Sequence, residues 1–180
     1  SSTGAPLLLN TTDATPDIAS IVGGTGITAT STSTYVTISA DALPHAQVHM
    51  QGNSTATTIA SAGTPVKVAG TFTVGIQSGF TGDTTGKIVY NGTTTRVVNV
   101  KASATVKPAT QSSQDLFLQI AKNGAVIAGS KIVREVDTAQ TANLFTFFNI
   151  SLAQNDFVEV FVGNATSTDN VVVSDIVIGL

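Results

Sequence analysis

Apolar and polar residues alternate with a period of two along most of this 180-residue chain. Strict alternation predicts a β-strand with one buried face, because successive strand residues point to opposite sides of a sheet. The clearest example is the segment 93–107, whose apolar positions are Val98, Val100, Ala102, Ala104 and Val106. Convincing helical periodicity is missing apart from a weak helix candidate between Asp41 and Met50. The chain is therefore predicted to be all-β.

Two Asn-Gly pairs mark turns between predicted strands. Asn123-Gly124 separates the alternating segment 115–122 from the apolar run 125–128, and Asn91-Gly92 separates segment 87–90 from the long strand. An Asn-Gly pair tolerates positive φ and fits the twist of a tight hairpin, so both pairs are predicted to join antiparallel neighbours. Further strands are predicted at 65–74, 131–136, 141–152, 156–162 and 170–178.

Regular short strands without crossover helices indicate an antiparallel sandwich or jelly roll. The predicted jelly-roll head spans residues 45–180. Charged residues make up only 11% of the chain, against roughly 25% in globular proteins, so the surface must consist largely of Ser, Thr, Asn, Gln and Gly. Such a neutral, hydroxyl-rich surface fits an extracellular or virion surface.

Residues 1–44 differ in composition, being rich in Thr, Ser, Gly and Ala. Segments 21–27 and 35–39 predict two short strands around a glycine turn, which cannot bury a core by themselves. Three copies wrapped into a narrow shaft would bury their apolar residues against symmetry mates. The residues predicted at this contact are Ile21, Ile27, Val36 and Ile38. The alternative is a partly disordered, Ser/Thr-rich linker.

Aromatic residues occupy faces that a single sandwich does not bury. Phe145 and Phe147 lie opposite the apolar face formed by Leu144, Phe148, Ile150 and Leu152, and Phe117 lies opposite Leu116, Leu118 and Ile120. Phe117, Phe145 and Phe147 are therefore predicted to be buried between subunits. Cover by the N-terminal segment or by loops of the same chain is the alternative.

Residue types needed for catalysis are scarce. The chain has no Cys or Trp and only two His, and it lacks the Gly-x-Ser-x-Gly nucleophile turn. Glu135 and Asp137 share one face of a strand, as a glycosidase pair could. Their neighbour Arg134 and the strand end favour a solvated charged turn instead. We predict no catalytic residue, no cofactor and no enzymatic activity.

His45 and His49 are four residues apart, and on a three-fold axis each could meet its own copies around a metal ion. No carboxylate or Cys completes a ligand set within one chain, so the sequence favours ordinary histidines at the neck between shaft and head, with no metal site. Gly23-Gly-Thr-Gly26 lacks the Lys-Ser/Thr of a phosphate loop and predicts a turn.

Charge and hydropathy argue against two classes of partner. The net charge is -3 and the eight Lys and Arg are scattered singly, so no basic stripe is available for nucleic acid. No apolar run approaches the roughly 20 residues that span a bilayer, which argues against membrane insertion.

Two groups of segments carry a resemblance to known proteins. Gly23-Gly-Thr-Gly-Ile27 with Tyr35-Val-Thr-Ile-Ser39 resembles the glycine-punctuated shaft repeats of viral and bacteriophage fibres, including the adenovirus fibre shaft. Segments 90–100, 120–127, 156–162 and 171–178 resemble, in that order, the heads of phage and viral spikes with the jelly roll shared by tumour necrosis factor and complement-type trimers.

The resemblance implies a trimeric spike or fibre protein at the virion surface, with a receptor-binding or vertex-capping head on a thin stalk. Its implied partners are further copies of itself, other virion proteins and a host receptor, for which a glycan is one candidate. The chain departs from the pattern in having one shaft repeat rather than a series, and no motif identifies a receptor site. A capsid shell protein and a cell-surface carbohydrate-binding module or adhesin are the alternatives.

Overall fold

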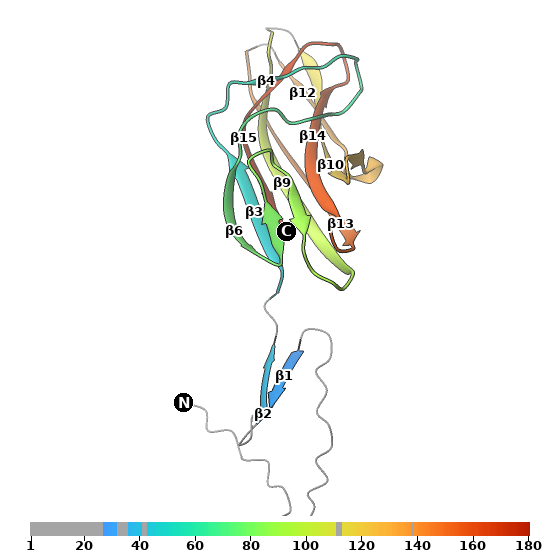
Figure 1. Ribbon diagram of the computed structural model, residues 1–180. Helices are drawn as coiled ribbons and strands as arrows, with labels where there is room; N and C mark the ends of the chain where they lie inside the picture. Colours follow the sequence, from blue (N-terminus) through green and yellow to red (C-terminus); the bar gives the residue numbers. More distant parts are fainter. Residues whose placement is uncertain (1–26, 32–35, 41–42, 111–112, 138) are drawn as a thin grey trace, which may run out of the picture. The chain divides into compact units, whose positions relative to one another are not determined.

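The computed structural model describes residues 27–31, 36–40, 43–110, 113–137 and 139–180 (Figure 1). The chain divides into two compact units, residues 1–42 and 43–180. We call the second unit the head. Its elements are β3 (His45–Met50), β4 (Ala56–Thr57), β5 (Val66–Lys67), β6 (Thr73–Ser78), β7 (Phe80–Gly82), β8 (Ile88–Tyr90), β9 (Arg96–Pro108), β10 (Gln114–Lys122), β11 (Ala125–Val126), the 3-10 helix η1 (Ala128–Ser130), β12 (Ile132–Val136), β13 (Ala142–Leu152), β14 (Phe157–Asn164) and β15 (Val171–Gly179).

Two antiparallel sheets face each other in the head (Figure 1). One has six strands in the order β13-β9-β15-β3-β6, with β4 beside β15. The other has seven strands in the order β11-β10-β14-β8-β7, with β12 beside β10 and β5 beside β14. The chain passes from one sheet to the other in the steps β8-β9-β10 and β13-β14-β15, which is the connectivity of a jelly roll. The predicted all-β jelly-roll sandwich is confirmed.

The core between the sheets follows the period-two pattern of the sequence. In β9 the alternating residues from Val100 to Val106 are buried, and β13 pairs with β9 from Ala142 opposite Val106 to Leu152 opposite Arg96. The inward residues of β13 include Leu144, Ile150 and Leu152. Because strand residues alternate between faces, this register fixes which residues of both strands point outward.

One of the two predicted Asn-Gly hairpins is confirmed. Asn123 and Gly124 have φ values of 52° and 76° and join the antiparallel strands β10 and β11. The prediction of a hairpin at Asn91-Gly92 is wrong, because β8 pairs with β7 and β14 whereas β9 lies in the other sheet. The Asn91 N–H donates to the carbonyl of Gly79, and Gly92 lies against the Tyr90 ring, so this segment carries the chain between sheets.

The weak helix candidate between Asp41 and Met50 is also wrong. Residues 45–50 form β3, in which Ala46, Val48 and Met50 are buried in alternation. The buried positions are spaced by two, which suits a strand that fills one side of the sandwich.

The described part of the first unit is a two-stranded antiparallel ladder, β1 (Ile27–Ser31) and β2 (Val36–Ala40). The observed strand β2 lies within one residue of the predicted strand 35–39. The observed strand β1 begins at Ile27, the last residue of the predicted strand 21–27. Ile27 is opposite Ala40, Ala29 opposite Ile38 and Ser31 opposite Val36, so these positions share one face of the ladder. Ile21 and the glycine turn lie outside the described residues.

The position of Phe117 contradicts the prediction that this residue is buried between subunits together with Phe145 and Phe147. Phe117 is 0% exposed within the single chain. Strand β12 pairs with β10 beside it, the Lys131 ammonium lies 4.0 Å from its ring centroid, and Gly163 on β14 is opposite it. The same-chain alternative is therefore correct for Phe117, because the excursion through η1 and β12 covers this position.

The fit of Phe117 against Gly163 can be tested with a double-mutant cycle. A Cβ at Gly163 would overlap the Phe117 ring, so Gly163→Ala should cost about 1–3 kcal/mol of unfolding free energy. Phe117→Leu should cost on the order of 1–2 kcal/mol through lost packing. We expect the double variant to lose clearly less than the sum of both in urea unfolding, because the smaller side chain accommodates the methyl group. Additive losses would contradict this packing.

Candidate functional site

The outer side of the six-stranded sheet exposes a pair of aromatic rings. Phe145 and Phe147 on β13 are 54% and 62% exposed, and their ring centroids are 6.0 Å apart. Their predicted orientation away from the core is confirmed. Strand β13 forms one edge of this sheet, so the two rings project beside an open strand edge.

The strand register shows which residues lie beside these rings on the neighbouring strands. Phe145 lies opposite Ser103, which lies opposite Val177, which in turn lies opposite His49. The exposed large apolar side chains of this surface, which we call the outer apolar face, are Ile76, Val97, Phe145, Phe147 and Val177.

Two of these residues reach the surface for different reasons. Val97 has the outward parity of β9, in which Val98 and Val100 point the other way. Ile76 is turned outward by the irregular register between β3 and β6, at Ala46/Val48. Parity could have identified Val97 from the sequence, whereas no sequence signal marked the irregularity that exposes Ile76.

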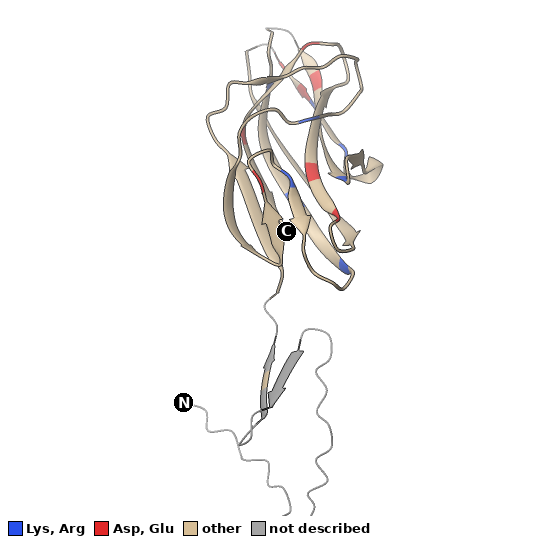
Figure 2. Ribbon diagram, viewed as in Figure 1, with Lys and Arg blue, Asp and Glu red and all other residues tan. Residues whose placement is uncertain are grey.

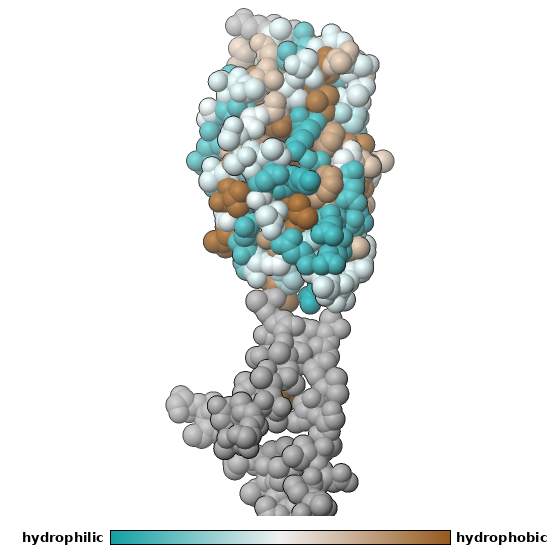
Figure 3. Space-filling view, in the orientation of Figure 1, coloured by the Kyte–Doolittle hydropathy of each residue, from teal (hydrophilic) through white to brown (hydrophobic). Residues whose placement is uncertain are grey.

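Charged residues are few on the head, and Lys101 is the cross-strand neighbour of Phe147. Figure 2 shows few and scattered charged residues on the head, and Figure 3 shows hydrophobic patches between neutral and hydrophilic ones. Exposed large apolar side chains that gather on one side of a folded domain can mark a site of protein contact. The outer apolar face is therefore the candidate functional site.

The two histidines lie on β3, four residues apart along one strand. His45 is exposed, with Nδ1 3.0 Å from the carbonyl oxygen of Leu43. His49 is partly buried, and its Nδ1 has no hydrogen-bond partner among the described residues. Groups of three or more metal-ligating side chains are absent from the described residues.

Glu135 and Asp137 are both exposed near the end of β12. The Ser113 hydroxyl donates to Asp137 at 2.9 Å, and Asp115 is the cross-strand neighbour of Glu135. This placement agrees with a solvated charged strand end. Within the described ranges, no helix has the length and hydropathy needed to cross a membrane.

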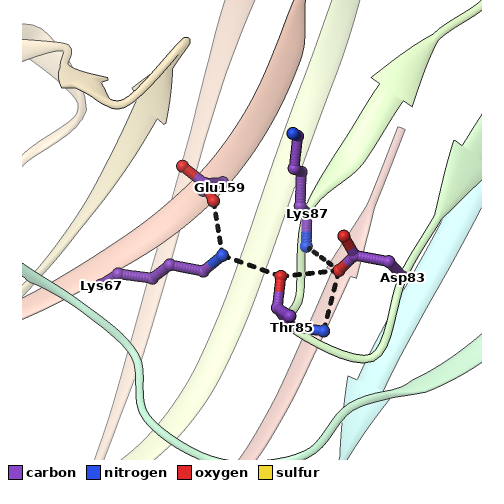
Figure 4. Close-up of polar contacts among 5 residues, drawn as sticks. All are labelled: Lys67, Asp83, Thr85, Lys87 and Glu159. Atoms are coloured by element: carbon purple, nitrogen blue, oxygen red, sulfur yellow. Dashed lines mark hydrogen bonds and ion pairs between the residues drawn. The ribbon is translucent and has the colours of Figure 1, made fainter.

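Figure 4 shows a polar cluster on the seven-stranded sheet, formed by Lys67, Asp83, Thr85, Lys87 and Glu159. The Lys67 ammonium donates to Glu159 at 2.5 Å and to the Thr85 hydroxyl at 2.9 Å. The Thr85 hydroxyl donates to Asp83 at 2.7 Å, and the backbone N–H groups of Thr85 and Lys87 donate to the same carboxylate.

The electrostatics of this cluster indicate a structural role. Burial alone would raise the pKa of Asp83, but hydrogen bonds from Thr85 and Lys87 and the nearby charge of Lys67 outweigh burial and lower it. The side chains of Lys67, Asp83, Thr85 and Glu159 are bonded to one another, so the cluster fixes the turn 83–87 and β5 against β14.

A second charged group clamps two turns of the head together. Asp156 accepts hydrogen bonds from Lys122, Asn123 and the backbone of Ala153, which lower its pKa to about 2. Because the folded-state pKa is lowered from 3.8, the stabilisation is present above about pH 4 and is lost as the pH falls towards 2.

Comparison with known proteins finds likeness in structure only. No family model and no curated protein matches the chain. The vertex protein P5 of PRD1 is similar with a TM-score of 0.47 and 16% identity over 99% of this chain and 95% of that chain. Murine APRIL is similar with a TM-score of 0.45 and 8% identity, over 75% of this chain and 97% of that one. Eiger TNF from S. frugiperda gives 0.42 and 12%, over 77% and 94%. These values assign no family or function.

The structural role of the polar cluster predicts a specific pattern of stability. Lys67→Met should cost about 1–3 kcal/mol, because it leaves the buried Glu159 carboxylate without its ammonium partner. Lys67→Met/Glu159→Leu should recover part of this loss, since neither charge then remains. Lys107→Met, at an exposed lysine on β9, is the matched control and should change stability by less than about 0.5 kcal/mol in urea unfolding. An unchanged Lys67→Met variant would refute this role.

Proposed function

We propose that this chain is a non-enzymatic structural protein of a virion, the trimeric head of a spike or fibre on a short β-rich shaft. It attaches the virus to its host or joins parts of the vertex or tail. The observation that carries the proposal is the outer apolar face, because a charge-poor sandwich that exposes Phe145 and Phe147 is suited to contact with further copies.

The energetics show that the head contact needs more than the two phenylalanines. Complete burial of one large side chain contributes about 1.5–3 kcal/mol, so this pair supplies at most about 3–6 kcal/mol per subunit. Association costs an estimated 4–15 kcal/mol or more. A stable assembly therefore requires further apolar contact, to which Ile76, Val97 and Val177 on the head can contribute.

The first unit is a second source of contact. Ile38 is 60% exposed on β2, and an isolated two-stranded hairpin is at best marginally stable in water. Three copies wrapped around one axis would bring Ile21, Ile27, Val36 and Ile38 against symmetry mates. The resemblance of segments 23–27 and 35–39 to fibre shaft repeats supports this arrangement and the choice of a trimer over a dimer.

The proposed partners follow from a surface location on the virion. They are two further copies of the chain, neighbouring virion proteins and a host-cell receptor. The weakly charged, hydroxyl-rich surface supports recognition by neutral contacts, for which a receptor glycan is suitable. No nucleic acid or membrane insertion is part of this proposal.

The assembly role of the outer apolar face is tested by comparing two neighbouring phenylalanines. Phe147→Ser should weaken assembly and leave the folded head intact, because this side chain is 62% exposed. Phe148→Ser should destabilise the head by about 3 kcal/mol, because Phe148 packs against the core. Light scattering reports the mass and circular dichroism the melting of each variant. Equal loss of folded protein in both, without a separable monomer, would be inconsistent with the proposal.

The attachment role is tested by competition on host cells. Purified wild-type protein, added before the virus that carries it, should reduce adsorption in a concentration-dependent way by occupying receptors. The monomeric form of Phe147→Ser should compete at least tenfold less well, because three linked heads bind with higher avidity than one. A folded trimer that binds no host cells and leaves adsorption unchanged would contradict attachment and restrict the function to virion assembly.

A further inference from the structure

A hollow opens at one end of the six-stranded sheet, beside the start of β3 and the end of β15. Its volume is about 530 Å³. We call this hollow the trough, and the lining residues that matter here are Leu43, Ile76, Arg96, Val97, Lys101 and Gly179. All of them belong to the head.

The trough has a simple origin in the strand register. Phe147 on β13 lies opposite Lys101, which lies opposite Gly179, which lies opposite Gln47 on β3. Gly179 contributes no side chain to this row and leaves the sheet surface low at its position. Leu43, Ile76 and Val97, at 79%, 75% and 70% exposure, surround this low point as an apolar rim.

The aromatic pair of the same chain does not occupy the trough. Phe147 is the cross-strand neighbour of Lys101 on the near side of the trough, yet neither Phe145 nor Phe147 is among the residues that line it. Gln47, on the far side, is three strand spacings of about 4.8 Å each from Phe147, or roughly 14 Å away. The trough is therefore open to the rings of another copy of the chain.

The charges of the trough suit an aromatic occupant. Lys87 lies 4.1 Å from the ring centroid of Phe157, and Lys131 covers Phe117 in the same way. Among the described residues, neither Phe145 nor Phe147 has such a cation over its ring. Arg96 and Lys101 line the trough and form no ion pair with another described residue. A cation above an aromatic face is favourable by about 0.5–2 kcal/mol.

We propose that Phe145 and Phe147 of one copy occupy the trough of a second copy, with Arg96 and Lys101 beside their rings. This inference rests on the proposed self-assembly and specifies which surface of one copy contacts which surface of the next. The contact joins two different surfaces, so repeating it around a three-fold axis closes a ring. The trough then contains the neighbouring subunit and is not a small-molecule site.

Engineered cysteines test this contact, because the chain has no Cys of its own. Asn143→Cys combined with Ile76→Cys should form disulfides between subunits under mild oxidation. Asn143 is an exposed residue of β13 two positions from Phe145, so this variant keeps both phenylalanine rings. Asn143→Cys with Val97→Cys or with Leu43→Cys provides alternative geometries, since a disulfide requires Cα atoms about 4.4–6.8 Å apart. Strands β13 and β6 are the two edges of the sheet, so the thiols introduced at Asn143 and Ile76 of one chain are too far apart to pair. Asn143→Cys/Val133→Cys is the control, because Val133 is also exposed but lies on β12.

The products on a non-reducing gel and the native mass together decide the outcome. A covalent trimer from at least one trough pair, with the control remaining monomeric, is the expected result. A covalent dimer together with a dimeric wild-type mass would support the trough contact and contradict the proposed trimer. A trimeric wild type whose three trough pairs cross-link no more than the control would overturn this inference alone.

Discussion

A two-layered β-sandwich buries one side of each sheet, and the other side of each sheet must face water or be covered. In this chain the inward residues of β9 and β13 fill the core, and the long ladder between these strands fixes the orientation of every residue along both. The aromatic residues placed at outward positions therefore cannot be accommodated by the core. The two sheets resolve this constraint differently, and the proposed function depends on that difference.

The seven-stranded sheet buries the outward ring of Phe117 with its own chain, while Ile132 and Val133 on β12 stay exposed. The excursion through η1 and β12 covers Phe117, while the Lys67–Glu159 pair fixes β5 against β14. The outer side of the six-stranded sheet keeps Phe145 and Phe147 exposed next to an open edge strand. This difference in aromatic exposure explains why the six-stranded side of the head is the one proposed for contact between copies.

Local patterns predicted much of this fold, because alternation and turn chemistry act over a few residues. The strands around β9 and β13 and the Asn123-Gly124 turn are examples. The failures concern choices made by distant parts of the chain. Asn91-Gly92 has the composition of a hairpin turn, yet the strands on its two sides belong to different sheets. The alternation in β10 correctly predicts that Phe117 lies on the face opposite Leu116 and Leu118. The same alternation cannot reveal the position of β12, which lies beside Phe117 and helps to bury it. The trough likewise depends on Gly179 meeting Lys101 and Gln47 across strands.

The proposed function depends on self-association of the wild-type chain. Sedimentation equilibrium at micromolar concentration measures this directly and independently of molecular shape. We expect a mass three times that of the 18.3 kDa chain, with dissociation only on dilution or denaturation. A folded protein that sediments with the mass of one chain across that concentration range would contradict the central claim, because the outer apolar face would then remain in water without a partner.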